Sequence, residues 1–258
     1  MSDSLIIQTE PLPHVVQLSL NRPAVRNALN ADMLRCLYEK LQHVAHPTRA
    51  LLITAEGKHF CAGADLEEMK KAGDLPRHEN EQQAALLLET LFRLHAVSIP
   101  VIIAAEGSCF GGALGVLAAA DIVILGGGAK FCLSEVKLGL VPAIISPFLA
   151  EKTGISPLLR YALTAEIFNA DRAVAMGLAH EVVEEGTALA FALSLAEKIA
   201  TNAPAAVKTC KGMLRSQLPH KIELAQLHQR GSLLSGLRAG AEAKEGISAF
   251  FEKRPPIF

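Results

Sequence analysis

The longest apolar stretch of the chain runs from Cys109 to Ala129, and Asp121 is its only charged residue. A membrane-spanning helix needs about 20 consecutive apolar residues without a central charge. In this stretch a carboxylate stands near the middle, and glycines recur on both sides of it. We therefore expect these residues to form a densely packed interior, and we expect no membrane partner.

The overall composition is that of a globular protein. The sequence has 258 residues, of which half are hydrophobic and a fifth are charged. This length is enough for one large domain, or for a domain with an appendage, around a sizeable core. The formal net charge is −1, so no basic excess indicates a nucleic-acid partner.

The cysteines and the first residues indicate a reducing compartment. The number of cysteines is odd and no pair has Cys-x-x-Cys spacing, which favours reduced thiols over a disulfide framework or a zinc site. They are Cys36, Cys61, Cys109, Cys132 and Cys210. Residues Met1–Ser4 have no positive charge and no long apolar run follows, so a secretory leader is not expected. We expect a cytoplasmic protein without a metal ion.

Short apolar runs alternate with helical patterns along the first two thirds of the chain. The runs that predict strands are Leu5–Thr9, Val15–Leu20, Ala50–Thr54, Val101–Ala105, Ile122–Leu125 and Lys130–Leu133. Apolar residues at helical spacing predict a helix capped by Asn30 and further helices over Glu79–Ala96 and Gly111–Ala120. The recurring unit is strand, strand, helix, which favours an α/β spiral over a doubly wound sheet.

The last third of the chain is predicted to be helical. The expected helices are one capped by Asn169 and ending at Gly177, then Ala188–Ala200, Pro204–Ser216, His220–Ser235 and Glu242–Glu252. We therefore divide the chain into a core of residues 1–186 and a helical region of residues 187–258. Apolar residues in that region form a stripe that must be buried against something: Ile222, Leu224, Leu227, Leu233, Leu234 and Leu237.

Three segments combine small residues with residues that can do chemistry. The first, His59–Leu66, is a loop after a predicted strand, where small side chains let a ligand approach the main chain. The second, Glu106–Gly115, runs into a helix N-terminus, where free N–H groups and the helix dipole favour a negative oxygen. Two such donors aimed at one thioester carbonyl would stabilise an enolate.

The third segment, Ser134–Leu140, places Glu135 among apolar residues, where burial would raise the pKa of its carboxyl towards an acid/base value. Each segment also has an ordinary structural interpretation. The glycines of the second segment are also explained by close packing alone. Asp65 is also explained as the cap of the next helix, and Glu135 as a helix cap or a member of an ion pair. The chain has no Gly-x-Gly-x-x-Gly, no Gly-x4-Gly-Lys-Ser/Thr and no Gly-x-Ser-x-Gly motif, which counts against nucleotide-dependent and serine-hydrolase chemistry.

Taken together, the segments resemble the enoyl-CoA hydratase/isomerase (crotonase) family over nearly the whole chain. The matching residues are Asn21-Arg22-Pro23, Asn27-Ala28-Leu29, Ala62–Leu66, Phe110-Gly111-Gly112, Asp121-Ile122, Glu135, Leu138-Gly139, Lys244-Glu245-Gly246 and Phe250–Arg254. The resemblance implies a ββα spiral core that carries a CoA-thioester site. It also implies that the helical region of residues 187–258 packs subunits into a homotrimer or a dimer of trimers.

The resemblance also implies roles for single residues. Ala64 and Gly112 match the two residues whose N–H groups form an oxyanion hole. Ala62 matches a residue beside the adenine of CoA, and Lys58 matches a basic position near the CoA phosphates. Phe250 and Lys253 match residues that reach CoA from a neighbouring subunit. Glu135 matches the second of two catalytic glutamates, and CoA enters only as the carrier of the substrate, with no further cofactor.

The sequence departs from the family pattern at three places. Gly115 stands where the typical hydratase has its first glutamate, Glu67 stands where a CoA-contacting lysine is common, and 142–147 replaces a glycine-rich stretch. A two-glutamate mechanism therefore cannot be transferred to this chain. The second proton-transfer group stays open, with Glu67, Glu68, His78 and Cys109 as candidates.

Three functions remain in view. The first is an enoyl-CoA hydratase, or in reverse a 3-hydroxyacyl-CoA dehydratase, for which 138–148 resembles relatives that act on branched or carboxylated acyl groups such as methylglutaconyl-CoA. The second is a Δ3,Δ2-enoyl-CoA isomerase that uses a single carboxylate. The third is a member that binds CoA esters or RNA with little catalysis.

Overall fold

The computed structural model describes residues 4–44, 47–218 and 222–258. Its strands are β1 (Ile6–Leu12), β2 (Val15–Leu20), β3 (Ala50–Ala55), β4 (Val101–Ala105), β5 (Ser108–Phe110), β6 (Ile122–Gly126), β7 (Lys130–Cys132), β8 (Phe168–Asn169) and β9 (Glu181–Val183). Its α-helices are α1 (Ala31–Gln42), α2 (Leu66–Gly73), α3 (Arg77–His95), α4 (Gly112–Ala119), α5 (Ser146–Thr153), α6 (Ile155–Thr164), α7 (Ala170–Ala175), α8 (Ala188–Thr201), α9 (Pro204–Arg215), α10 (Leu224–Ala239) and α11 (Ala241–Glu252). Two short 3₁₀ helices, η1 (Pro23–Val25) and η2 (Glu135–Leu138), complete the described elements.

Two sheets form the core of the described residues. In the larger sheet the strand order is β1-β2-β3-β4-β6-β9, with β1 antiparallel to β2 and every later pair parallel. In the smaller sheet the order is β5-β7-β8. The chain leaves β4 of the larger sheet for β5 of the smaller one, makes α4, and returns through β6 to β7. This alternation is the predicted strand, strand, helix spiral, and the prediction is confirmed.

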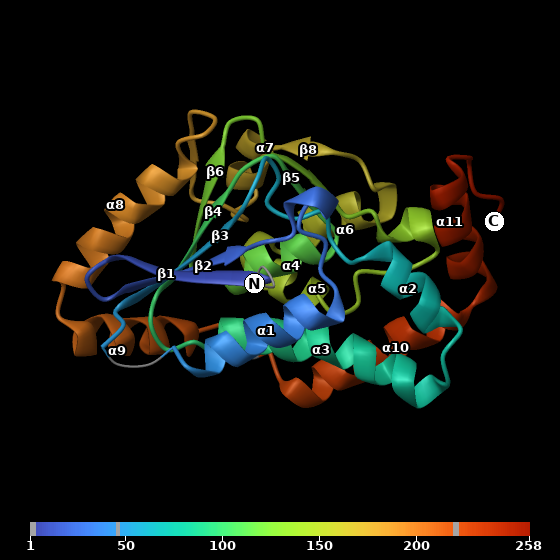
Figure 1. Cartoon of the computed structure of the whole chain (residues 1–258), viewed down its shortest axis with the longest axis horizontal. Coiled ribbons are helices and arrows are strands. Elements are labelled where there is room, and N and C mark those ends of the chain that lie inside the picture. Colours follow the sequence, from blue (N-terminus) through green and yellow to red (C-terminus); the bar gives the residue numbers. More distant parts are fainter. Residues whose placement is uncertain (1–3, 45–46, 219–221) are drawn as a thin grey trace.

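Helices cover both faces of the larger sheet (Figure 1). On one face α8 packs against the strands through small side chains, among them Ala188, Ala192 and Ala196. On the other face α1, α3 and α4 enclose the main core with apolar side chains from the strands. The stretch that begins at Cys109 is the centre of this core, because every residue of α4 is buried. No helix among the residues described is long and apolar enough to cross a membrane.

Local signals placed several helix ends correctly. The Asn30 side chain accepts a hydrogen bond from the N–H of Met33, and Asn169 does the same for Arg172, as their positions predicted. The Asp65 side chain accepts hydrogen bonds from the N–H groups of Glu67 and Glu68 and so begins α2. The ordinary interpretation of Asp65 as a helix cap is therefore confirmed.

The C-terminal helices pack against several parts of the chain. α10 lies along α3 and α2, and α11 lies against η2 and α2. Leu227 and Leu234 of the predicted apolar stripe are buried within the chain, whereas Leu233 is exposed. α10 begins at Leu224 and ends at Ala239, later than expected, and His220 lies outside the described residues. α8, from the predicted helical region, packs on the large sheet of the predicted core. The division of the chain between residues 186 and 187 stays a prediction.

Candidate active site

A cavity of about 410 Å³ opens between the loop after β3, the start of α4, η2 and the C-terminal helices. Five of the residues that the sequence singled out line it: Ala62, Ala64, Gly112, Glu135 and Phe250. They come from segments far apart in the sequence, so the fold brings them together. Lys58 and Lys253 lie outside this lining. Lys58 is exposed in the loop after β3, and Lys253 ends α11 in the left-handed conformation.

Two backbone N–H groups without acceptors stand close together in this cavity. The N–H of Leu29 donates to the carbonyl of Gly63, and the N–H of Asp65 donates to the carbonyl of Leu29, but the N–H of Ala64 between Gly63 and Asp65 has no acceptor among the described residues. Gly112 is the first residue of α4, where an N–H has no partner within the helix. A Cβ built on Gly112 would lie 3.9 Å from the nitrogen of Ala64. Neither N–H finds an acceptor among the described residues.

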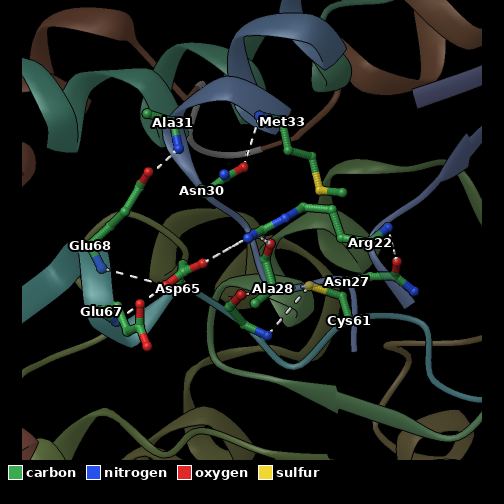
Figure 2. Close-up of polar contacts among 11 residues, drawn as sticks. Arg22, Asn27, Ala28, Asn30, Ala31, Met33, Cys61, Asp65, Glu67 and Glu68 are labelled. Atoms are coloured by element: carbon green, nitrogen blue, oxygen red, sulfur yellow. Dashed lines mark hydrogen bonds and ion pairs between the residues drawn. The ribbon is translucent and has the colours of Figure 1, made fainter. Parts of the chain in front are cut away.

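An ion pair holds the loop that carries Ala64 (Figure 2). The guanidinium of Arg22 bonds both to the carboxylate of Asp65, at 3.1 Å, and to the carbonyl of Ala28. The amide of Asn27 donates to the carbonyls of Glu56 and His59 at the other end of the loop. These contacts involve residues by which the sequence resembled its family, and they fix the backbone around Ala64.

The loop of Ala64 also packs directly on the strand that leads into α4. Gly63 has φ +95°, and a Cβ there would lie only 2.6 Å from the carbonyl oxygen of Phe110. At this position only glycine combines the left-handed backbone with such a close approach. The N–H of Phe110 in turn donates to the carbonyl of Cys61. The two segments that carry the free N–H groups are therefore tied to each other.

Glu135 lies beside the start of α4. A Cβ built on Gly111 would be 3.4 Å from its Oε1, whereas its Oε2 is buried and has no hydrogen-bond partner among the described residues. Burial raises the pKa of the Glu135 carboxyl to about 7. A group with this pKa is present in both protonation states at neutral pH, as an acid/base catalyst requires.

The helix α11 holds the segment that carries Glu135. Gly139 ends η2 in the left-handed conformation, and a Cβ there would lie 2.6 Å from the backbone nitrogen of Ala243. Gly246 packs just as closely on the backbone of Leu138. The same helix places Phe250 at the cavity of its own chain. Its predicted contact with a neighbouring subunit stays a prediction.

The position of the missing first glutamate is filled by other side chains. A Cβ built on Gly115 would overlap the Cγ2 of Ile145 and come within 2.9 Å of the Cδ1 of Leu91. Ile145 belongs to the segment 142–147 that departs from the family pattern, so the two departures are one structural feature. An apolar side chain occupies the space beside α4, and a glutamate does not fit there.

The candidates for a second proton-transfer group differ in their surroundings. Glu67 is exposed, and the exposed His78 lies 3.7 Å from Glu79. Cys109 is fully buried, and burial raises the pKa of its thiol well above its usual value. Glu68 accepts a hydrogen bond from the N–H of Ala31 and lines a small recess beside Ala64.

Sequence reasoning missed several polar residues that line the cavity. They are Arg26, Ser134, Lys137 and Arg238. Arg26 and Lys137 are exposed cations, which gives the cavity two positive charges near its surface. In the sequence, Arg26 and Arg238 have no distinguishing pattern, whereas Ser134 and Lys137 lie in the segment that carries Glu135 but were given no role. No group of histidines, cysteines and carboxylates that could hold a metal ion is found in the part of the chain that the structure describes.

A ββα spiral with a cavity that pairs free backbone N–H groups with a buried glutamate defines an enzyme of the crotonase type. The comparisons with known proteins agree. A family profile described as enoyl-CoA hydratase/isomerase matches residues 13–258. The chain therefore belongs to the enoyl-CoA hydratase/isomerase family.

Individual relatives resemble the chain over almost all of its length. The 2,3-dehydroadipyl-CoA hydratase of Escherichia coli is 36% identical over 95% of this chain and 94% of its own. The crystal structure of an enoyl-CoA hydratase from Shewanella pealeana superposes with a TM-score of 0.80 at 33% identity, covering 99% of this chain and 96% of that chain. The crystal structure of an enoyl-CoA hydratase from Mycobacterium avium superposes with a TM-score of 0.85 at 28% identity, covering 98% of both chains.

Proposed function

We propose that the protein adds water across the C2–C3 double bond of an enoyl-CoA thioester, or removes it in the reverse direction. The observation that carries this proposal is the cavity that places a buried carboxyl with a pKa of about 7 beside two unused N–H groups. The family and the hydratase names of its relatives support the same chemistry.

The proposed mechanism uses Glu135 as the base and the backbone as the oxyanion site. The carboxylate of Glu135 takes a proton from water, and the hydroxide oxygen forms a bond to C3. The electron pair of the double bond moves towards the thioester oxygen, where the N–H groups of Ala64 and Gly112 stabilise the enolate. One such donor is worth about 3–4 kcal/mol of barrier. A proton delivered to C2 completes the addition.

The surroundings of Gly115 bear on the source of the proton for C2. Ile145 and Leu91 fill the space beside Gly115, and Glu135 is the only carboxylate among the described residues that line the cavity. We propose that the protonated Glu135, or a water molecule held by the backbone, delivers this proton. The mechanism then depends on one carboxyl.

The same observation favours a second candidate, a Δ3,Δ2-enoyl-CoA isomerase. A single carboxylate that removes a proton from one carbon and returns it two carbons away needs no partner and no added water. The oxyanion site would stabilise the dienolate in the same way. The apolar wall at Ile145 is consistent with a reaction from which water is excluded.

The CoA part of the substrate is proposed to lie along the cavity wall that Ala62 and Phe250 line. The exposed Arg26 and Lys137 supply positive charge for its phosphate groups. Lys58 and Lys253 are proposed to act on the same phosphates from outside the lining. A homotrimer or dimer of trimers, with a neighbouring chain at each CoA, is proposed on the family resemblance.

Product analysis tests the proposed function. The purified protein is incubated separately with 2-enoyl-CoA and 3-enoyl-CoA esters, and products are identified by mass and by the absorbance of the conjugated thioester. Hydration lowers the absorbance of 2-enoyl esters and adds the mass of water. Isomerisation of 3-enoyl esters raises the absorbance without a change in mass. Binding of all esters without any product would contradict both catalytic proposals.

A further inference from the structure

Arg238 of α10 is a buried cation in the wall of the active-site cavity. Its residue is 7% exposed, and it lines both the main cavity and an adjoining recess of about 50 Å³. Ala64 also lines both spaces, so the recess begins next to the proposed oxyanion site. The surrounding wall is mostly apolar, with Met69, Leu87 and Leu234 on it.

The guanidinium of Arg238 has no partner among the described residues. Its side chain makes no hydrogen bond or ion pair there, and its Nε is buried. Burial lowers the pKa of this guanidinium from its usual value, because removal from water disfavours the charged form. Buried charges in proteins are normally paired, since an unpaired one costs several kcal/mol.

The two carboxylates that line the recess are already engaged elsewhere (Figure 2). Asp65 forms its ion pair with Arg22 and caps α2, and Glu68 accepts from the N–H of Ala31 at 2.8 Å. Neither carboxylate lies within ion-pair distance of Arg238. The fold thus provides a buried guanidinium, and the two carboxylates of the recess have other partners.

The position of Arg238 is fixed by close packing of two helices. A Cβ built on Gly73, at the end of α2, would lie 2.8 Å from the carbonyl oxygen of Arg238. The missing side chain lets α10 approach α2, and Asn80 of α3 holds α10 by donating to the carbonyl of Ser235. These contacts fix the backbone of α10 at Arg238, whose side chain lines the cavity.

We propose that Arg238 binds a carboxylate at the far end of the acyl chain, so that the substrate is an enoyl-CoA ester of a dicarboxylic acid. This inference rests on the proposed function for the orientation of the thioester at Ala64 and Gly112. The planar guanidinium donates two parallel N–H groups to a carboxylate, and such pairs are strong where water is excluded. A phosphate of CoA is the less suitable partner, because Arg26 and Lys137 stand nearer to solvent.

Matched substrates and variants test the inference. The substrates are hex-2-enoyl-CoA, the same chain ending in a carboxylate (hex-2-enedioyl-CoA), and the latter with its free carboxylate converted to an amide. The variants are Arg238→Met, which keeps the length of the side chain without its charge, and Arg238→Lys. Arg230→Met is the control, because Arg230 is exposed on the same helix.

The wild-type protein is expected to prefer the carboxylate over both neutral chains in kcat/KM and in Kd. Arg238→Met should lower kcat/KM for the carboxylate by roughly a hundredfold or more, and should leave the neutral ester unchanged or improved. Arg238→Lys should recover part of the loss, and Arg230→Met should behave as wild type.

Three results would overturn the inference while leaving the proposed function intact. The first is a wild-type protein that hydrates the neutral ester as well as the carboxylate. The second is an equal loss for all esters in Arg238→Met, which would assign Arg238 to CoA binding or to the fold. The third is a wild-type protein that binds the carboxylate ester and the corresponding amide with equal Kd. This result decides the question even if Arg238→Met does not fold. Conversely, binding that depends on both the carboxylate and Arg238, without any turnover, would support the inference and contradict the proposed function.

Discussion

Replacing Glu135 with glutamine tests both the chemistry and the energetics of the buried carboxyl. Its pKa in the folded protein is about 7, against an ordinary 4.5. The folded state therefore binds the proton more tightly than the unfolded chain does. The contribution of the Glu135 carboxyl to the stability of the folded protein is fully present below pH 4.5 and is lost as the pH rises to about 7. At 1.36 kcal/mol per pH unit, the whole interval corresponds to about 3 kcal/mol.

Glutamine has nearly the same shape and carries no charge at any of these pH values. The free energy of unfolding of Glu135→Gln minus that of wild type should therefore increase by about 2 kcal/mol between pH 5 and pH 8. Turnover should fall by roughly a hundredfold or more, because the amide is neither acid nor base. In the wild type, kcat/KM for hydration should fall as the pH drops below about 7, where Glu135 becomes protonated.

Urea unfolding of both proteins at the two pH values measures the first effect, and enoyl-thioester absorbance measures the second. Glu39→Gln is the control, because Glu39 is exposed on α1. The reasoning is refuted if Glu135→Gln shows the same pH dependence of stability as wild type. A variant that keeps most of its activity on the best substrate would make Glu135 a structural residue.

Gly112→Pro should lower turnover by roughly a hundredfold, since it removes one proposed donor at a helix position that accepts proline. The control Gly112→Ala keeps the N–H, and its Cβ fits at ordinary contact distances. Similar turnover of the two variants would contradict the oxyanion site. Gly115→Ala should lower the free energy of unfolding by about 1–3 kcal/mol through overlap with Ile145. In a double-mutant cycle measured by urea unfolding, Gly115→Ala and Ile145→Ala should be strongly coupled. Additive effects of the two substitutions would argue against the overlap. Sedimentation equilibrium should show a trimer or hexamer, and Lys253→Ala should raise KM for the CoA ester more than it lowers kcat. A monomer that is active at the same dilution would remove the case for a shared site.

Local sequence signals placed most of the described elements, because they act within a few residues. The bounds of β2 and β4 match the apolar runs, and the side chains of Asn30 and Asn169 cap the helices that they were expected to begin. The strands β5, β8 and β9 were not predicted. Each has only two or three residues, too few for an alternating pattern to be recognised.

The candidate site was predicted in part, and the residues differ in how they could be found. Gly112 and Glu135 carry local signals, a helix N-terminus and a carboxylate among apolar residues. Ala62, Ala64 and Phe250 were selected by family resemblance, because no local pattern relates them to the other two. The fold places all five in one cavity.

The sequence by itself determined the strand, strand, helix order, the helix caps and the presence of small residues where main-chain N–H groups must stay accessible. Only the tertiary structure decided that Ile145 fills the space beside Gly115, and that Phe250 lines the cavity of its own chain. It also decided that Arg238, which in the sequence is an ordinary basic residue at the end of a helix, is buried without a partner among the described residues. Periodicity and capping act within one element, whereas burial and close contact depend on which distant elements pack together.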